Sequence, residues 1–167
     1  RYDLIRQEHF QMKVGFHPAL SFKDKTYASG DEMVETMVVR RYLAGELAPT
    51  WVAGKHFSAG IYYLASHGIE SDITQYTHYL VLRSTVMNIK LPGQLLFRFT
   101  PQVYYLKMDD LDGTYAALTL GLSSKKFPLS VTSMMNKILE TEIGGTKDFS
   151  WNVSLVYTFS RNFAAVK

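Results

Sequence analysis

The stretch Phe10-Gln11-Met12-Lys13-Val14-Gly15-Phe16-His17 sets the pattern of the whole chain. Its apolar residues fall at every second position, and polar or small residues fall between them. Successive side chains of a β-strand point to opposite faces, so this alternation predicts a strand with one apolar and one polar face. The same pattern returns near the end of the chain, in residues 151–159.

Six further segments fit strands, which makes eight in all. They are residues 36–51, 56–66, 76–91, 95–107, 114–123 and 127–137. The segment 76–91 is apolar on both faces near its start, which leaves its register open. Residues 31–47 also fit an amphipathic helix with Val34, Val38 and Tyr42 four apart, and residues 134–142 have a similar helical character. We prefer strands at 36–51 because the length and the following turn fit the repeat.

The connections between these segments alternate in length. Short turns occupy residues 53–55, 92–93 and 124–126, and longer polar loops occupy 24–31, 67–74, 109–113 and 142–148. All short turns and both termini would then lie at one end of the sheet, and all long loops at the other. This arrangement is typical of an up-and-down antiparallel β-barrel with one plain and one decorated rim. We therefore expect a single all-β domain over residues 1–167.

Composition excludes several classes of protein. The chain has 167 residues and no Cys, which excludes disulfides, zinc–cysteine sites, iron–sulfur clusters and thiol catalysis. Its formal net charge of +3 comes from scattered Lys and Arg, so we expect no nucleic-acid partner. His9, His17, His56 and His78 show no metal-ligand spacing on one face, so no metal or cofactor is expected. The chain begins at Arg1 without Met, which indicates a processed protein or a fragment.

Alternation alone does not show whether the apolar face points into the barrel or outward to lipid. Aromatic residues gather on that face near the strand ends, as in the interface girdles of membrane proteins. Several strands run ten residues or more, enough to cross a bilayer at a tilt. These observations favour a transmembrane barrel, in which a lumen charge network would form on the opposite face. The interface aromatics are Trp51, Phe57, Tyr63, Tyr105, Trp151, Tyr157 and Phe159, and the network is Lys13, His17, Arg40, Glu46 and Arg98.

Two arginines conflict with this assignment. Arg41 and Arg83 would point at lipid, at a cost of about 2–4 kcal/mol near the bilayer midplane. Arg41 is close to the long-loop rim, where it can extend toward water. Arg83 indicates that its strand shifts register through a bulge, or that it faces a partner.

The closing stretch Trp151-Asn152-Val153-Ser154-Leu155-Val156-Tyr157-Thr158-Phe159, followed by Phe163, resembles the last strand of Gram-negative outer-membrane β-barrel proteins. In that family an aromatic-ended final strand is the signal for the barrel-insertion machinery. This chain departs from the pattern because four residues follow Phe163. The resemblance implies a bacterial outer-membrane location, with outer-membrane lipid, the insertion machinery and other envelope proteins as partners.

Two loops contain residues that can carry chemistry. Ser66-His67-Gly68-Ile69-Glu70-Ser71-Asp72 combines a hydroxyl, an imidazole and carboxylates. Ser66 and His67 are neighbours on an extended chain and so point to opposite sides, which favours a solvated polar loop. Asp109-Asp110-Leu111-Asp112-Gly113 has the oxygen ligands that Ca²⁺ prefers, but it lacks the spacing of an EF-hand.

We therefore expect a non-enzymatic outer-membrane barrel of about eight strands, without catalytic residues, or the C-terminal half of a wider barrel. It would act as a small structural or accessory barrel of an envelope complex, or as part of a porin-like channel. In the channel, Lys13, Arg40 and Arg98 would favour anions. Two alternatives are an outer-membrane lipid-modifying hydrolase barrel and a soluble lipocalin-like carrier with the apolar face inside.

Overall fold

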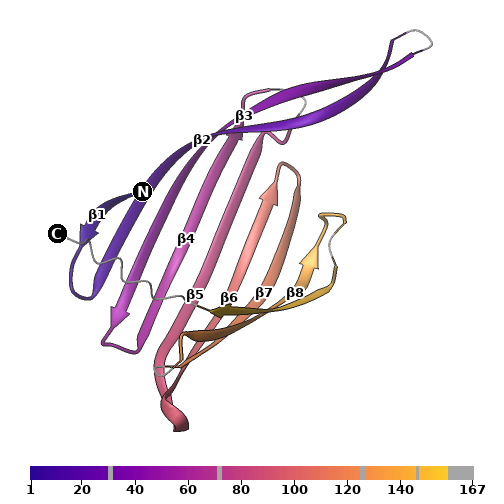
Figure 1. The fold of residues 1–167 in the computed structure, drawn as a ribbon. Coiled ribbons are helices and arrows are strands. Elements are labelled where there is room, and N and C mark those ends of the chain that lie inside the picture. The colour runs from indigo at the N-terminus through magenta and orange to yellow at the C-terminus, as the bar shows by residue number, and fades with distance from the viewer. Residues whose placement is uncertain (30–31, 71–72, 125–126, 146, 158–167) are drawn as a thin grey trace, which may run out of the picture.

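The computed structural model of the protein describes residues 1–29, 32–70, 73–124, 127–145 and 147–157. Within these residues nine strands form one sheet in chain order, each antiparallel to the next (Figure 1). One 3-10 turn, η1 (Pro92–Gln94), joins two of them. The strands are β1 (Tyr2–Arg6), β2 (Phe10–Ser29), β3 (Glu32–Ala53), β4 (Phe57–Gly68), β5 (Tyr76–Leu91), β6 (Leu95–Met108), β7 (Leu111–Ser124), β8 (Leu129–Thr141) and β9 (Phe149–Tyr157).

The eight predicted strands are confirmed as strands, and most run further than predicted. Residues 32–47 belong to β3 and residues 134–141 to β8, so the helical alternatives for these segments are wrong. The sequence prediction missed β1, which is only five residues long and whose register shifts between Asp3 and Ile5. Period-two alternation cannot be recognised over so short and irregular a strand.

The sheet is open, so the prediction of a closed eight-stranded barrel needs correction. Among the described residues β1 pairs only with β2 and β9 pairs only with β8. Neighbouring strands alternate in direction, and with nine of them β1 and β9 run the same way. These two edges therefore cannot form an antiparallel pair with each other, which is the pairing an up-and-down barrel requires.

The predicted alternation of short turns and long loops holds only in part. Residues 54–56 and 92–94 are short turns at one end of the sheet, and Lys125 and Lys126 of the third predicted turn lie outside the described residues. At the other end, residues 69–75 and 142–148 are the longer connections. In the predicted loop 109–113, only residues 109 and 110 form a turn, in which Asp109 has φ 53°, and residues 111–113 belong to β7. Polarity alone had suggested a loop there.

Residues 24–29 of the predicted loop 24–31 belong to β2, and residues 30 and 31 lie outside the described residues. β2 and β3 pair with each other from Phe10 and Trp51 outward, but β3 pairs with β4 only from Tyr42 onward. The earlier part of β3 and the later part of β2 therefore form a two-stranded ribbon that projects beyond the sheet (Figure 1). The N-terminus lies partway along the sheet, not at its short-turn end as predicted, because β1 precedes β2.

The two faces of the sheet differ sharply in polarity and in burial. One, the apolar face, carries large exposed side chains such as Phe16 (67% exposed), Trp51 (64%) and Leu155 (67%). The other, the polar face, carries the least exposed side chains, including Tyr115 (4%) and Glu46 (7%). Ala44, Val81 and Ala117 are also buried and belong to the polar face by register. The side chains that pack closely are thus those of the polar face.

The pairing of β5 settles its register and the position of Arg83. Arg83 pairs with Gly60 on β4 and with Gln102 on β6, on the polar face. A shift in pairing does occur in β5, as proposed, but it lies later, between Val86 and Ile89. The conflict that alternation raised at Arg83 is therefore resolved, because Arg83 does not lie on the apolar face.

Candidate functional site

The buried carboxylate of Glu46 is the centre of the polar face. Its side chain is only 2% exposed and accepts hydrogen bonds from Arg1 Nε, from Arg1 Nη2 at 2.9 Å and from the Tyr62 hydroxyl at 2.7 Å. The Nε2 atom of His17 lies 3.2 Å from the same carboxylate. These partners come from the N-terminus, β2 and β4, so Glu46 connects the first four strands. A buried carboxylate is tolerated only with such partners.

Gly15 provides the space for this carboxylate. It pairs with Glu46 across β2 and β3, and a Cβ at Gly15 would lie 2.5 Å from Glu46 Oε1 and 2.8 Å from its Cγ. A side chain at this position would displace Glu46 from its partners. Glycine is therefore required here by the close approach of the side chain.

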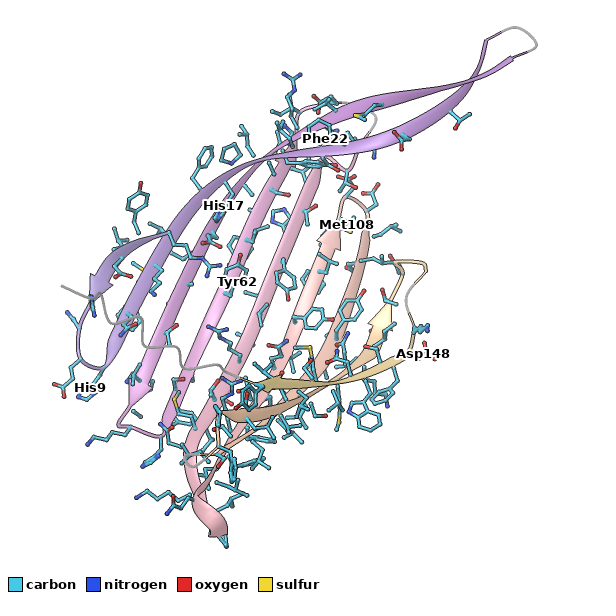
Figure 2. All side chains as sticks on the ribbon, viewed as in Figure 1. His9, His17, Phe22, Tyr62, Met108 and Asp148 are labelled. Atoms are coloured by element: carbon cyan, nitrogen blue, oxygen red, sulfur yellow. The ribbon has the colours of Figure 1, made fainter. Side chains whose placement is uncertain are left out.

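Four tyrosines continue from Glu46 across the sheet as a tyrosine belt, with one residue on each of β4 to β7: Tyr62, Tyr79, Tyr104 and Tyr115. The first three rings contact edge to face, with centroids 6.1 Å and 5.6 Å apart, and Tyr104 stacks on Tyr115 at 4.8 Å. These are the favourable geometries for aromatic pairs. Tyr62 lies near the middle of the sheet (Figure 2).

Both ends of the tyrosine belt are anchored. At one end the guanidinium of Arg1 lies 5.5 Å from the centre of the Tyr62 ring, a cation–π contact. At the other end Tyr104 donates to Asn136 Oδ1 at 3.1 Å, and the Tyr115 hydroxyl lies 2.9 Å from Thr141 Oγ1. The belt and the Glu46 cluster therefore join the N-terminal residue Arg1 and strands β2 through β8 by side-chain contacts.

Sequence reasoning missed this belt. Tyr62, Tyr79, Tyr104 and Tyr115 occur at polar-face positions of four strands, and this placement was the only available signal. To predict that these four rings are neighbours, one must know the register of each strand pair. Alternation within a strand does not give that register. Arg1 was missed for the same reason, since it meets Glu46 from 45 residues away.

The predicted lumen charge network is only partly assembled. His17 and Glu46 meet, but Lys13 lies 3.8 Å from Asp3 of β1. Arg98 lies over Gly121 of β7, where an added Cβ would be 3.3 Å from its Nε. Arg40 is on the polar face and pairs with Ser21 of β2. The five residues share a face, on which His17 contacts Glu46 and Lys13 lies beside Asp3.

The predicted interface aromatics lie on the apolar face wherever the structure describes them. By register, Trp51, Phe57 and Tyr157 are near the short-turn end. The group toward the other end is Tyr63, Tyr105 and Trp151, and the polar atom of each is hydrogen-bonded, to His78, Asp112 and Ser133 respectively. Phe159 lies outside the described residues.

Ser66 and His67, predicted to lie in a loop, belong to β4 and do not form a catalytic pair. Ser66 pairs with Ala44 and Thr77 on the polar face, whereas the neighbouring His67 projects to the other face and packs on Tyr76 with ring centres 4.9 Å apart. Its Nδ1 lies 3.0 Å from the carbonyl oxygen of Gln75. Ser71 and Asp72, also named in this cluster, lie outside the described residues.

Glu70 in the same loop has a different role. Its carboxylate accepts bonds from Arg41 Nε at 2.6 Å and from the Arg41 backbone amide at 2.8 Å. Arg41 is on the apolar face near the long-loop end, as predicted, and Glu70 compensates its charge there. The pKa of Glu70 is lowered, first by the backbone hydrogen bond from Arg41 and then by the side-chain bond.

The carboxylates of Asp109 and Asp112, in the candidate cation loop, already accept hydrogen bonds from other residues. The Asp109 carboxylate accepts from the backbone amides of Gln75 at 2.9 Å and Tyr76 at 2.7 Å, and Asp112 accepts from the Tyr105 hydroxyl at 2.8 Å. Across the described ranges, no three His, Asp or Glu side chains are grouped as metal ligands would be. These aspartates fasten the turn to neighbouring strands.

Comparison with known proteins identifies no relative. No family model matches the chain, and neither the curated proteins nor the solved structures contain a match. In the part of the chain that the structure describes, no helix has the length and apolarity needed to span a membrane.

Proposed function

We propose that this chain forms a sector of a transmembrane β-barrel in a bacterial outer membrane, with a non-enzymatic role. The observation that carries the proposal is the inverted distribution of polarity over the two faces. The Glu46 cluster and the tyrosine belt pack on one face, and large apolar side chains project from the other. An apolar surface extending over most of a sheet indicates a membrane or protein partner, because in water its exposure is unfavourable.

The same distribution argues against the alternative of a soluble carrier. A lipocalin-like carrier would bind its ligand against apolar side chains packed inside the barrel. Here the closely packed face holds Glu46, His17 and four tyrosine hydroxyls. The hydrolase alternative lacks a Ser66–His67 pair on a common face.

Strand parity favours a wide barrel over a small closed one. Closing this sheet with antiparallel pairs requires an odd number of additional strands between β9 and β1. In such a barrel the polar face would line a lumen carrying Lys13, Arg83 and Arg98. A lumen with these cations would favour anions, as in a porin-like channel. The other role that we consider is a structural or accessory barrel of an envelope complex.

The proposal implies three kinds of partner. Outer-membrane lipid would cover the apolar face, and the aromatic-rich strand β9 would be presented to the barrel-insertion machinery. Other envelope proteins would contact the projecting β2–β3 ribbon and the loops at that end.

A charge substitution on each face tests the membrane proposal. Leu82 is 51% exposed on the apolar face, so Leu82→Arg would be nearly neutral if that face met water. Facing lipid near the midplane, the same change would cost about 2–4 kcal/mol. Thr119→Arg, on the polar face at mid-strand, is the matched control, with a smaller expected cost. The measurement is the denaturant midpoint of the protein in phospholipid vesicles. Equal midpoints for Leu82→Arg and wild type would refute the proposal.

A second experiment separates the two roles. The native protein extracted from membranes is run unboiled beside boiled on a gel, with its intact mass read from the same sample. A heat-dependent shift is expected for a barrel, and recovery in the soluble fraction without a shift would contradict it. Anion-selective conductance in planar bilayers would support the channel, and a closed bilayer would support the accessory role.

A further inference from the structure

The apolar face contains an open hollow. Its volume is about 720 Å³ and it crosses β3 to β7. The floor is made of small side chains, Ala59, Ser84 and Ala116, together with Pro101. Trp51 forms one wall. The surrounding side chains are Phe10, Ile61, Leu82 and Val103.

The hollow lies toward one end of the sheet. Ala59 is four residues from Lys55 in the β3–β4 turn, which at ~3.3 Å per residue is about 13 Å. Phe57 stands between them, and Trp51 pairs with Ala59 at the side of the hollow; both aromatic residues are exposed on the apolar face. The order from the rim inward is thus cation, aromatic ring and apolar hollow, and this order matches the headgroup, interface and acyl-chain layers of a bilayer.

The rim beside the hollow carries a cation. Lys55 is exposed in its turn, and the Asn88 side-chain amide donates to the Lys55 carbonyl oxygen at 3.3 Å, which fastens this turn to β5. At the opposite end of the sheet acidic residues outnumber the basic residues Arg41, Lys107 and Lys147; they are Glu70, Asp109, Asp110, Asp112, Glu142 and Asp148. An exposed cation adjoining an apolar groove is complementary to a lipid with an anionic headgroup.

We propose that the hollow binds one acyl chain of an anionic phospholipid, whose phosphate is held at the short-turn rim by Lys55. This inference rests on the proposed membrane function and makes it specific. The site would hold one lipid molecule of one leaflet against β3 to β7. A smooth apolar face, by contrast, would be covered only by lipid acyl chains that exchange freely with the rest of the bilayer. The volume suits a ligand, since binding cavities fall in the range of about 300–1,000 Å³.

The two tryptophans of the chain provide the test. Trp51 lines the hollow, and Trp151 lies on the apolar face of β9, outside it. Single-tryptophan proteins, made with Trp151→Phe or Trp51→Phe, are inserted into phosphatidylcholine vesicles. The vesicles include a minor fraction of either phosphatidylglycerol or phosphatidylcholine with brominated acyl chains. Bromine quenches the fluorescence of a tryptophan that it contacts.

The expected result is that Trp51 is quenched more strongly by brominated phosphatidylglycerol than by brominated phosphatidylcholine, while Trp151 shows no preference. Lys55→Gln should reduce the preference about fivefold. Ala59→Leu fills the hollow and should abolish it. The matched control is Ala65→Leu, on the same strand and face but outside the hollow, which should leave the preference unchanged.

Three outcomes would overturn the inference in distinguishable ways. If both tryptophans are quenched equally by both lipids, the site is absent but the membrane function stands. If Trp51 is shielded from both lipids and the mass is that of a dimer, a second copy covers the hollow. If neither tryptophan is quenched by any lipid, the apolar face does not meet a bilayer and the proposed function fails as well.

Discussion

Replacing Gly15 by alanine tests whether the buried Glu46 cluster is as tightly fitted as the structure indicates. The new Cβ would meet Glu46 at 2.5 Å from Oε1, 2.8 Å from Cγ and 3.0 Å from Cδ, all well inside normal contact distances. Relief requires Glu46 to rotate away from Arg1 and Tyr62. Overpacking of this kind costs about 1–3 kcal/mol. Losing a hydrogen bond to the charged carboxylate, at about 1.5–3 kcal/mol, would bring the cost to the upper end.

The assay is the free energy of unfolding in phospholipid vesicles, followed by tryptophan fluorescence against denaturant. Gly45→Ala is the matched control, because a Cβ at Gly45 would meet nothing within 4 Å. The decisive comparison repeats Gly15→Ala in a Glu46→Ala background, where the clash no longer exists and the cost should fall close to zero. A cost equal to that of Gly45→Ala, or one that persists without Glu46, would refute the reasoning.

Three further predictions concern the anchors of the sheet. Because the pKa of Glu70 is lowered in the folded state, its stabilisation of the long-loop end is present above its unfolded pKa of about 4.3 and is lost as the pH falls through the lowered pKa. The protection factor of the Arg41 amide against hydrogen exchange should therefore fall in acid, and Glu70→Gln should remove much of that pH dependence. Asp109→Ala should speed exchange at the Tyr76 amide, whereas Asp109→Asn should preserve most of the protection; equal effects of the two would contradict the assigned bonds. Tyr115→Phe should cost about 1 kcal/mol, and Tyr115→Leu about 0.5–1.5 kcal/mol more through the lost ring stacking, as read from denaturant midpoints.

Alternation predicted the strands because a half-buried strand leaves a period of two in the sequence. It also separated the faces, and the described interface aromatics all lie on the apolar one. Alternation left the register of β5 open, because the start of this strand is apolar on both faces. Only the pairing of Arg83 with Gly60 and Gln102 places Arg83 on the polar face.

The contacts that complete the polar face join residues far apart in sequence. Two examples are the contacts of Arg1 with Glu46 and of Arg41 with Glu70. They could not be predicted without the register that places residues of different strands side by side. Closure was unpredictable for another reason. It depends on the parity of the strand count, and the short strand β1 changes that count from even to odd.

The tyrosine belt has a consequence for how the sheet unfolds. Hydrogen bonds in a meander join each strand only to its neighbours, so such a sheet can in principle fray strand by strand from either edge. A continuous row of touching rings from β4 to β7 opposes this, because losing one strand would leave the next ring without its partner. We expect the central strands to exchange their amide hydrogens as one cooperative unit, with β9 opening separately at much lower cost.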